Sequence, residues 1–118
     1  MLRYWIITDN IIMSGLQEST MTDKIPPVHP GEVLLEDYLI PKGISRNQLA
    51  MSMRVPPNRI GEIVQGKRAI TAETALRLAR AIGTSPDFWL NLQMQYDLRV
   101  AEDHLEDVLE REIIPIAV

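Results

Sequence analysis

Apolar residues recur about every three to four positions along most of the chain after Pro30, which is the period of an amphipathic α-helix. Segments with this pattern begin near Pro30, Ser45, Pro57, Thr71 and Ser85. Each segment is followed by glycine, proline or a short polar stretch that interrupts the period. The pattern therefore predicts an all-α fold.

Residues that start and stop helices flank these segments. Ser45 and Gln48 match a Ser-x-x-Gln capping box, and Ser85-Pro86-Asp87 combines an N-cap, a proline suited to the first turn and a favourable acid. We expect Pro41-Lys42-Gly43 to end the first helix and Gly83 to end the fourth. The fourth helix is expected to bury an apolar face made of Ala72, Ala75, Leu76, Ala79 and Ile82.

The chain divides into a leader, residues 1–25, and a folded domain, residues 26–118. The leader is apolar in patches, but Thr8-Asp9-Asn10 interrupts it and no small-residue cleavage site follows, so it is a poor signal peptide. We interpret it as an unstructured or adventitious extension, with Met21 as an alternative start. The other interpretation is an arm that pairs with a partner or a second subunit. No stretch is apolar for long enough to span a bilayer, so we expect a cytoplasmic protein without membrane contact.

The formal net charge of −4 hides a basic centre. Between Lys42 and Gly83, eight Lys or Arg residues stand against only Glu62 and Glu73, which gives +6. The part before this segment carries −4 and the part after it carries −6. A polyanion responds to the local field more than to the total charge. We therefore expect the central segment to face nucleic acid.

Residues 57–65 are the part of this basic segment best suited to reading DNA. A helix this short needs tertiary support, and Ile60, Ile63 and Val64 give it an apolar inner side. Arginine, asparagine, glutamine and glutamate can all hydrogen-bond to base edges in the major groove. The outer side carries Asn58, Arg59, Glu62 and Gln65. With the preceding helix, this predicts a helix-turn-helix over about residues 44–65, although any small helical bundle also exposes polar faces.

Three stretches, Ile44 to Ala50, Val55 to Ile60 and Gly66 to Arg68, resemble the lambda-repressor-like (XRE) helix-turn-helix family. Two further stretches, His29 to Glu32 and Gly83 to Gln93, are similar to HigA-type antitoxins within that family.

The resemblance covers about residues 28–98 and implies a five-helix DNA-binding domain with a C-terminal helical extension that forms a homodimer from about residue 85. It implies a repressor of its own operon that binds double-stranded operator DNA. It also implies a cognate HigB-type toxin as a partner, which in this family is a RelE-like, ribosome-dependent mRNA endonuclease.

The resemblance also implies residue roles. Arg46 would bind a phosphate, and Lys67 and Arg68 would clamp the DNA backbone. Donors at the N-terminus of the second helix and in the turn add to this set. The expected DNA-binding residues are Arg46, Asn47, Arg54, Pro57, Asn58, Arg59, Glu62, Gln65, Lys67 and Arg68.

Arg54 departs from the family pattern, which usually has glycine at this position of the turn, where φ is often positive. A non-glycine residue there costs about 1 kcal/mol. Either the turn has shifted, or the protein accepts the strain and Arg54 gains a phosphate contact. Arg46 also replaces the family's usual glutamine, which keeps a hydrogen-bond donor and adds a charge.

The aromatic residues near the start of the last helix have two interpretations. They either fill the core of the domain or form a dimer interface, where aromatic residues are enriched. The residues assigned to the dimer interface are Trp89, Leu92, Gln93 and Tyr96.

Other chemistry finds little support in the sequence. The chain has no cysteine, which excludes disulfides and thiolate sites and fits a reducing compartment. His29 and His104 are 75 positions apart, so we expect no metal site. Without a cysteine, a serine–histidine arrangement or a cluster of metal ligands, we also expect no enzyme activity, and we expect no cofactor. His29 is expected at the N-terminus of the first helix and His104 on a solvated face. Two rival functions are a free-standing XRE-type repressor without a toxin and a protein-interaction domain that no longer binds DNA.

Overall fold

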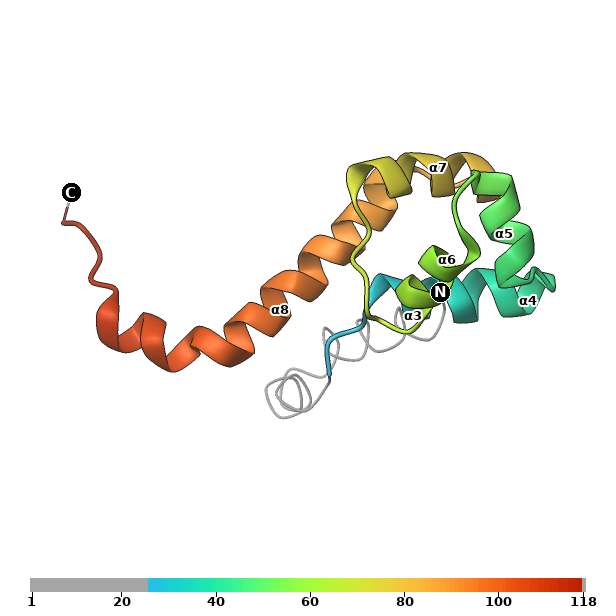
Figure 1. The fold of residues 1–118 in the computed structure, drawn as a ribbon. Helices are drawn as coiled ribbons and strands as arrows, with labels where there is room; N and C mark the ends of the chain where they lie inside the picture. Colours follow the sequence, from blue (N-terminus) through green and yellow to red (C-terminus); the bar gives the residue numbers. More distant parts are fainter. Residues whose placement is uncertain (1–25, 118) are drawn as a thin grey trace, which may run out of the picture.

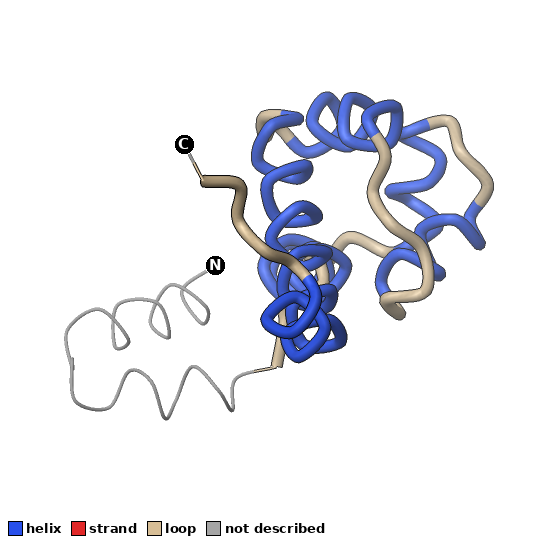
Figure 2. The backbone as a smooth tube through the Cα atoms, turned by 90° about the vertical axis from the view of Figure 1, so that its left-hand side faces the viewer, coloured by secondary structure: helices blue, strands red, loops and turns tan. Residues whose placement is uncertain are grey.

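The computed structural model describes residues 26–117, and the regular elements of this range are all helical (Figure 1). Loops join the helices, and no strand occurs within the described range (Figure 2). The elements are α3 (Pro30–Val33), η1 (Leu34–Leu39), α4 (Ile40–Lys42), α5 (Arg46–Met53), α6 (Pro57–Val64), α7 (Ala72–Ile82) and α8 (Pro86–Glu112). The predicted all-α class is confirmed, and the predicted leader, residues 1–25, lies outside the described residues.

The first helix is continuous through α3, η1 and α4, and its middle is π-helical. The Ile40 N–H donates to the Leu35 carbonyl, which is the spacing of a π-helix. Pro41 has no N–H, and its ring would collide with the carbonyl four residues earlier in an α-helix, so a wider turn relieves that collision. The expectation that Pro41-Lys42-Gly43 ends the first helix is confirmed: the helix ends at Lys42, and Gly43 follows in the left-handed conformation with φ 65°.

The predicted helix starts are confirmed at three positions. The Ser45 Oγ accepts from the Gln48 N–H at 3.0 Å, and the Gln48 Oε1 accepts from the Ser45 N–H at 3.1 Å, which completes the capping box. Thr71 and Ser85 each accept a hydrogen bond from the backbone N–H three residues later. The caps satisfy N–H groups that the helices themselves leave without partners.

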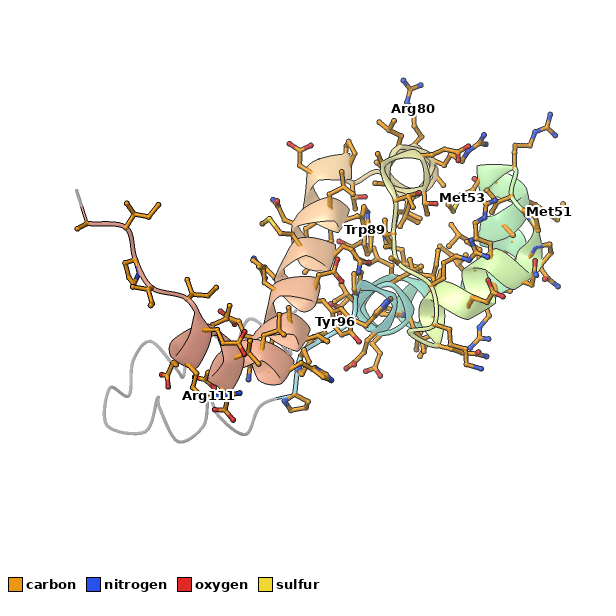
Figure 3. All side chains as sticks on the ribbon, turned by 60° about the vertical axis from the view of Figure 1, so that its left-hand side comes forward. Met51, Met53, Arg80, Trp89, Tyr96 and Arg111 are labelled. Atoms are coloured by element: carbon orange, nitrogen blue, oxygen red, sulfur yellow. The ribbon has the colours of Figure 1, made fainter. Side chains whose placement is uncertain are left out.

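The core lies where α3, α5, α6, α7 and the first half of α8 meet. Trp89 and Tyr96 both point from α8 towards this bundle (Figure 3). The Trp89 ring contacts Phe88 and Tyr38, with centroid distances of 4.9 and 5.5 Å. Most of the interior is aliphatic. The largest fully buried side chains include Trp89, Leu34, Leu39, Leu49, Ile60, Ile63 and Leu78.

The buried face of α7 differs from the predicted one. Ala72 is exposed and Leu76 is 58% exposed, whereas Leu78 is completely buried. Ala75 and Ala79 are buried as predicted, together with Thr74. The apolar residues of α7 permit two overlapping faces, and packing against both α5 and α8 selects the one that contains Leu78. The other face leaves Leu76 in solvent.

Helix α8 has 27 residues, and only its first half belongs to the bundle. That half packs against α7 and α3, and the second half extends away from the rest of the domain (Figure 1). The predicted start at about residue 85 agrees with the Ser85 cap. Among the described residues, no helix combines the length and the apolar character that a membrane span requires.

Candidate DNA-binding surface

Helices α5 and α6 pack against each other and are joined by the turn Arg54-Val55-Pro56. Arg54 has φ 60° and ψ 45°, the only positive φ of a non-glycine residue in the described chain. The Val55 N–H then donates to the Ala50 carbonyl at 3.0 Å, which closes α5. The turn has therefore not shifted: the protein accepts a left-handed arginine at the position where the family usually has glycine.

The inner side of α6 is held firmly. Ile60 and Ile63 are completely buried, and Val64 is partly buried, as the sequence predicts. Gly31 of α3 lies directly against the backbone of α6 on this inner side. A Cβ atom at Gly31 would collide with the Ile63 carbonyl and lie 3.0 Å from the Val64 Cα. The absence of a side chain at Gly31 thus lets α3 support the backbone of α6 directly.

The outer side of α6 faces solvent. Pro57, Asn58 and Gln65 are exposed, and Arg59 is half-buried. Glu62 is also on this side, but its carboxylate is not free. The Arg68 Nε donates to the Glu62 Oε1 at 2.7 Å, with the two side chains 48% and 39% exposed. The sequence alone treats Glu62 and Arg68 as separate contacts, whereas the structure pairs them.

The other predicted DNA contacts surround this face. Arg46 and Asn47 are exposed in the first turn of α5, and Arg46 lies beside α6, with its Nη1 3.8 Å from the Cβ position of Gly61. Arg54 and Lys67 are exposed in the turns before and after α6. The structure thus brings these residues together around one short helix whose inner side is buried.

Comparisons with known proteins agree with this geometry. A helix-turn-helix family matches residues 35–89. Virulence-associated protein I of Dichelobacter nodosus is 46% identical over 95 residues, which is 80% of this chain and 86% of that protein. An addiction module antidote protein of the HigA family from Coxiella burnetii is 46% identical, with a TM-score of 0.74 over 78% of this chain and 100% of that one. The chain belongs to the HigA family.

A second solved HigA structure contains DNA. The Pseudomonas aeruginosa antitoxin HigA, determined with the higBA promoter, is 38% identical, with a TM-score of 0.74 over 77% of this chain and 99% of that one. The resemblance stated from the sequence motifs is thereby confirmed at the level of family and fold.

In this HigA-family chain, His29 connects the end of α6 to α8. Its Nδ1 accepts from the Gly31 N–H at 2.9 Å, so it caps α3, as predicted. Its ring packs edge-on against Tyr96, with a centroid distance of 4.8 Å, and lies against Gly66 directly after α6. Burial lowers the pKa of His29, and the charge of Asp97 partly opposes that effect.

Two of the four residues assigned to the dimer interface serve the interior of the chain. Trp89 is completely buried, and its Nε1 donates to the Thr84 Oγ1 at 2.7 Å. The Gln93 Oε1 accepts from the Ile70 N–H at 2.8 Å, and its Nε2 donates to Asp97 at 2.9 Å. The assignment of Trp89 and Gln93 to a dimer interface is therefore corrected. Leu92 and Tyr96 are only partly buried, and their assignment stays a prediction.

Sequence reasoning missed a different apolar surface on α8. We call it the α8 stripe, and its members are between 45% and 57% exposed. At 100° per residue they fall within about 60° of one another on the helix, on the side opposite Trp89. The α8 stripe consists of Met94, Leu98, Leu105 and Leu109. A helical projection of the last segment would have revealed it, because the spacings of four and seven residues are those of a coiled-coil seam.

His104 is exposed, as predicted, and its Nδ1 lies 2.9 Å from the Val100 carbonyl. Within residues 26–117, no three His, Cys, Asp or Glu side chains are grouped closely enough to hold a metal ion.

Proposed function

We propose that this protein is a dimeric antitoxin that binds the operator of its own operon, represses it, and neutralises a RelE-like mRNA endonuclease of the HigB type. The observation that carries the DNA-binding part is the outer side of α6. Its polar side chains are exposed, while Ile60 and Ile63 on the opposite side are completely buried. The P. aeruginosa relative, whose structure contains promoter DNA, supports the same interpretation.

In this proposal α6 enters the major groove. Asn58, Arg59 and Gln65 read base edges, because these side chains can donate or accept at fixed positions of a base pair. Arg46, Asn47, Arg54 and Lys67 contact phosphates on the two sides of the groove. These contacts set the register of the protein on the duplex without reading sequence.

The dimer rests on the α8 stripe. Four apolar side chains, each about half-exposed, follow one side of a helix that projects from the bundle. Pairing two such helices removes both stripes from water and gives each dimer two recognition helices. A palindromic operator then presents half-sites about 34–36 Å apart, or a multiple of that distance.

The test of DNA binding is a gel-shift titration with the DNA upstream of the gene. Arg59→Ala should weaken binding by about tenfold to a hundredfold, because a good arginine–guanine contact contributes about 1–3 kcal/mol. Arg111→Ala is the matched control, since it removes the same charge at the far end of α8 (Figure 3). With about three phosphate contacts per subunit, log K should fall against log salt with a slope of about −5. A DNA affinity that does not change with salt concentration would contradict docking through α6. An equal loss of affinity in Arg59→Ala and Arg111→Ala would contradict it as well.

The toxin part has a separate test. The product of the neighbouring short reading frame is co-expressed with the tagged chain, and its mRNA cleavage is measured with and without the antitoxin. Stable co-purification and loss of cleavage support neutralisation. A neighbouring product that neither binds nor cleaves RNA would leave a free-standing repressor as the function.

A further inference from the structure

The α8 stripe fixes a register for two antiparallel copies. A two-fold axis beside Ala101 places Leu98 of one copy against Leu105 of the other, and the same axis places Met94 against Leu109. One two-fold axis thus pairs all four residues of the α8 stripe. This inference rests on the dimer of the proposed function. In this register Ile113 of one copy faces Leu90 of the other, so each chain end runs along the first turns of the other copy's α8.

The chain end is suited to contact another surface. We call residues 113–117 the C-terminal tail. It starts in an extended conformation, with φ −94° and ψ 120° at Ile113. Ile113, Ile114 and Ile116 are 61%, 83% and 89% exposed. Glu110 and Glu112 directly precede it, so the tail presents aliphatic side chains after an acidic stretch.

A complementary groove lies between the end of α5 and the outer side of α7. It is open and measures about 470 Å³. Its apolar part includes Leu76, the residue of α7 that sequence reasoning placed in the core and the structure leaves 58% exposed. Arg54, Arg77 and Arg80 also line it. Arg77 is held by Glu73 at 3.2 Å, whereas Arg54 and Arg80 form no ion pair with any residue of the described range.

We propose that the C-terminal tail of one copy docks in this groove of a second copy. Ile114 and Ile116 cover Leu76, and the carboxylates of Glu110 and Glu112 approach Arg80, which points away from the bundle (Figure 3). The charges fit, because the groove belongs to the central segment of +6 and the tail to the segment of −6.

The position of the tail argues for a second copy as the source of the docked segment. In one copy, the far end of α8 lies well away from α7 (Figure 1). In the antiparallel register the tail begins beside the first turns of the other copy's α8, against which that copy's α7 packs. A tail of this length spans roughly 17 Å when extended.

The test uses the absence of cysteine from the chain. Full-length Ala81→Cys, at the groove, is mixed with full-length Ile114→Cys under mild oxidation. We expect a disulfide-linked heterodimer on a non-reducing gel. The control replaces Ala81→Cys by Met51→Cys, which is 74% exposed on α5 and does not line the groove; it should link far less.

Sedimentation of the uncrosslinked variants provides the second measurement. Arg80→Glu should raise the dimer dissociation constant by about tenfold, and Glu110→Arg with Glu112→Arg in the same chain should restore it. A full-length dimer without the Ala81 cross-link, or one that Arg80→Glu leaves unchanged, overturns tail docking and leaves the α8 dimer intact. A full-length chain that sediments as a monomer overturns the dimer itself.

Discussion

The contact of Gly31 with α6 gives the sharpest prediction about how α6 is held in place. Gly31→Ala adds one methyl group at the point where α3 meets α6. That methyl collides with the Ile63 carbonyl and lies 3.0 Å from the Val64 Cα. Both obstacles are backbone atoms, so no side-chain rotation removes the collision. Either α3 or α6 must move as a unit.

The expected loss of folding free energy follows from the fact that the added methyl group meets backbone atoms. Overpacking a filled interior by one methyl costs about 1–3 kcal/mol, and the upper end applies where backbone blocks the group. For a chain of this size, about 3 kcal/mol lowers the melting temperature by roughly 10 °C. The displaced α6 should also bind operator DNA less tightly in a gel shift, even at temperatures where the variant is folded.

Gly61→Ala is the matched control. It makes the same change inside α6, but the nearest atom to the new methyl is the Arg46 Nη1 at 3.8 Å, which is ordinary contact. Alanine is about 1 kcal/mol better than glycine inside a helix, so this variant should gain stability. Urea unfolding followed by circular dichroism measures both variants. If Gly31→Ala unfolds at the urea midpoint of the parent, the close approach of α3 to α6 does not constrain this fold.

Three further predictions concern single residues. Arg54→Gly should stabilise the fold by about 1 kcal/mol in urea unfolding, because glycine adopts φ 60° without strain. The same change should weaken DNA binding, because it removes the phosphate contact proposed for Arg54. Gln93→Leu should cost about 1–3 kcal/mol, since it leaves the buried Ile70 N–H without its acceptor; an unchanged melting temperature would show that water replaces it. Burial lowers the pKa of His29 in the folded state, so its contribution to stability is complete above pH 6.5 and is lost as the pH falls through the lowered folded-state pKa. His29→Asn keeps a capping acceptor and should flatten that pH dependence in thermal melts.

Local chemistry made much of this fold predictable. Ser45, Thr71 and Ser85 cap helices through contacts with residues three positions away, so short motifs were enough to place the starts of α5, α7 and α8. The strain at Arg54 was also foreseeable, because the turn geometry of the family fixes it. These features depend on neighbours in sequence.

The features that sequence reasoning missed depend on distant neighbours. Leu76 and Leu78 are equally apolar, and only the positions of α5 and α8 decide which of them is buried. Gln93 is polar and looks available to a partner, but the Ile70 N–H, 23 residues earlier, occupies its side-chain oxygen. The Glu62–Arg68 pair likewise depends on how the loop after α6 folds back.

The undivided course of α8 has a consequence for how the two halves of the protein work together. No glycine or proline interrupts it between Asp87 and Glu112, so no hinge separates the half anchored in the bundle from the half that projects away from it. The angle around α8 between the side packed on the bundle and the outer part of the α8 stripe is therefore set by residue count alone. Inserting one residue near Ala101 would rotate the outer half by about 100° and move it by about 1.5 Å. Such a chain would keep every contact of the bundle, but Leu105 and Leu109 would no longer lie on the same side of the helix as Met94 and Leu98.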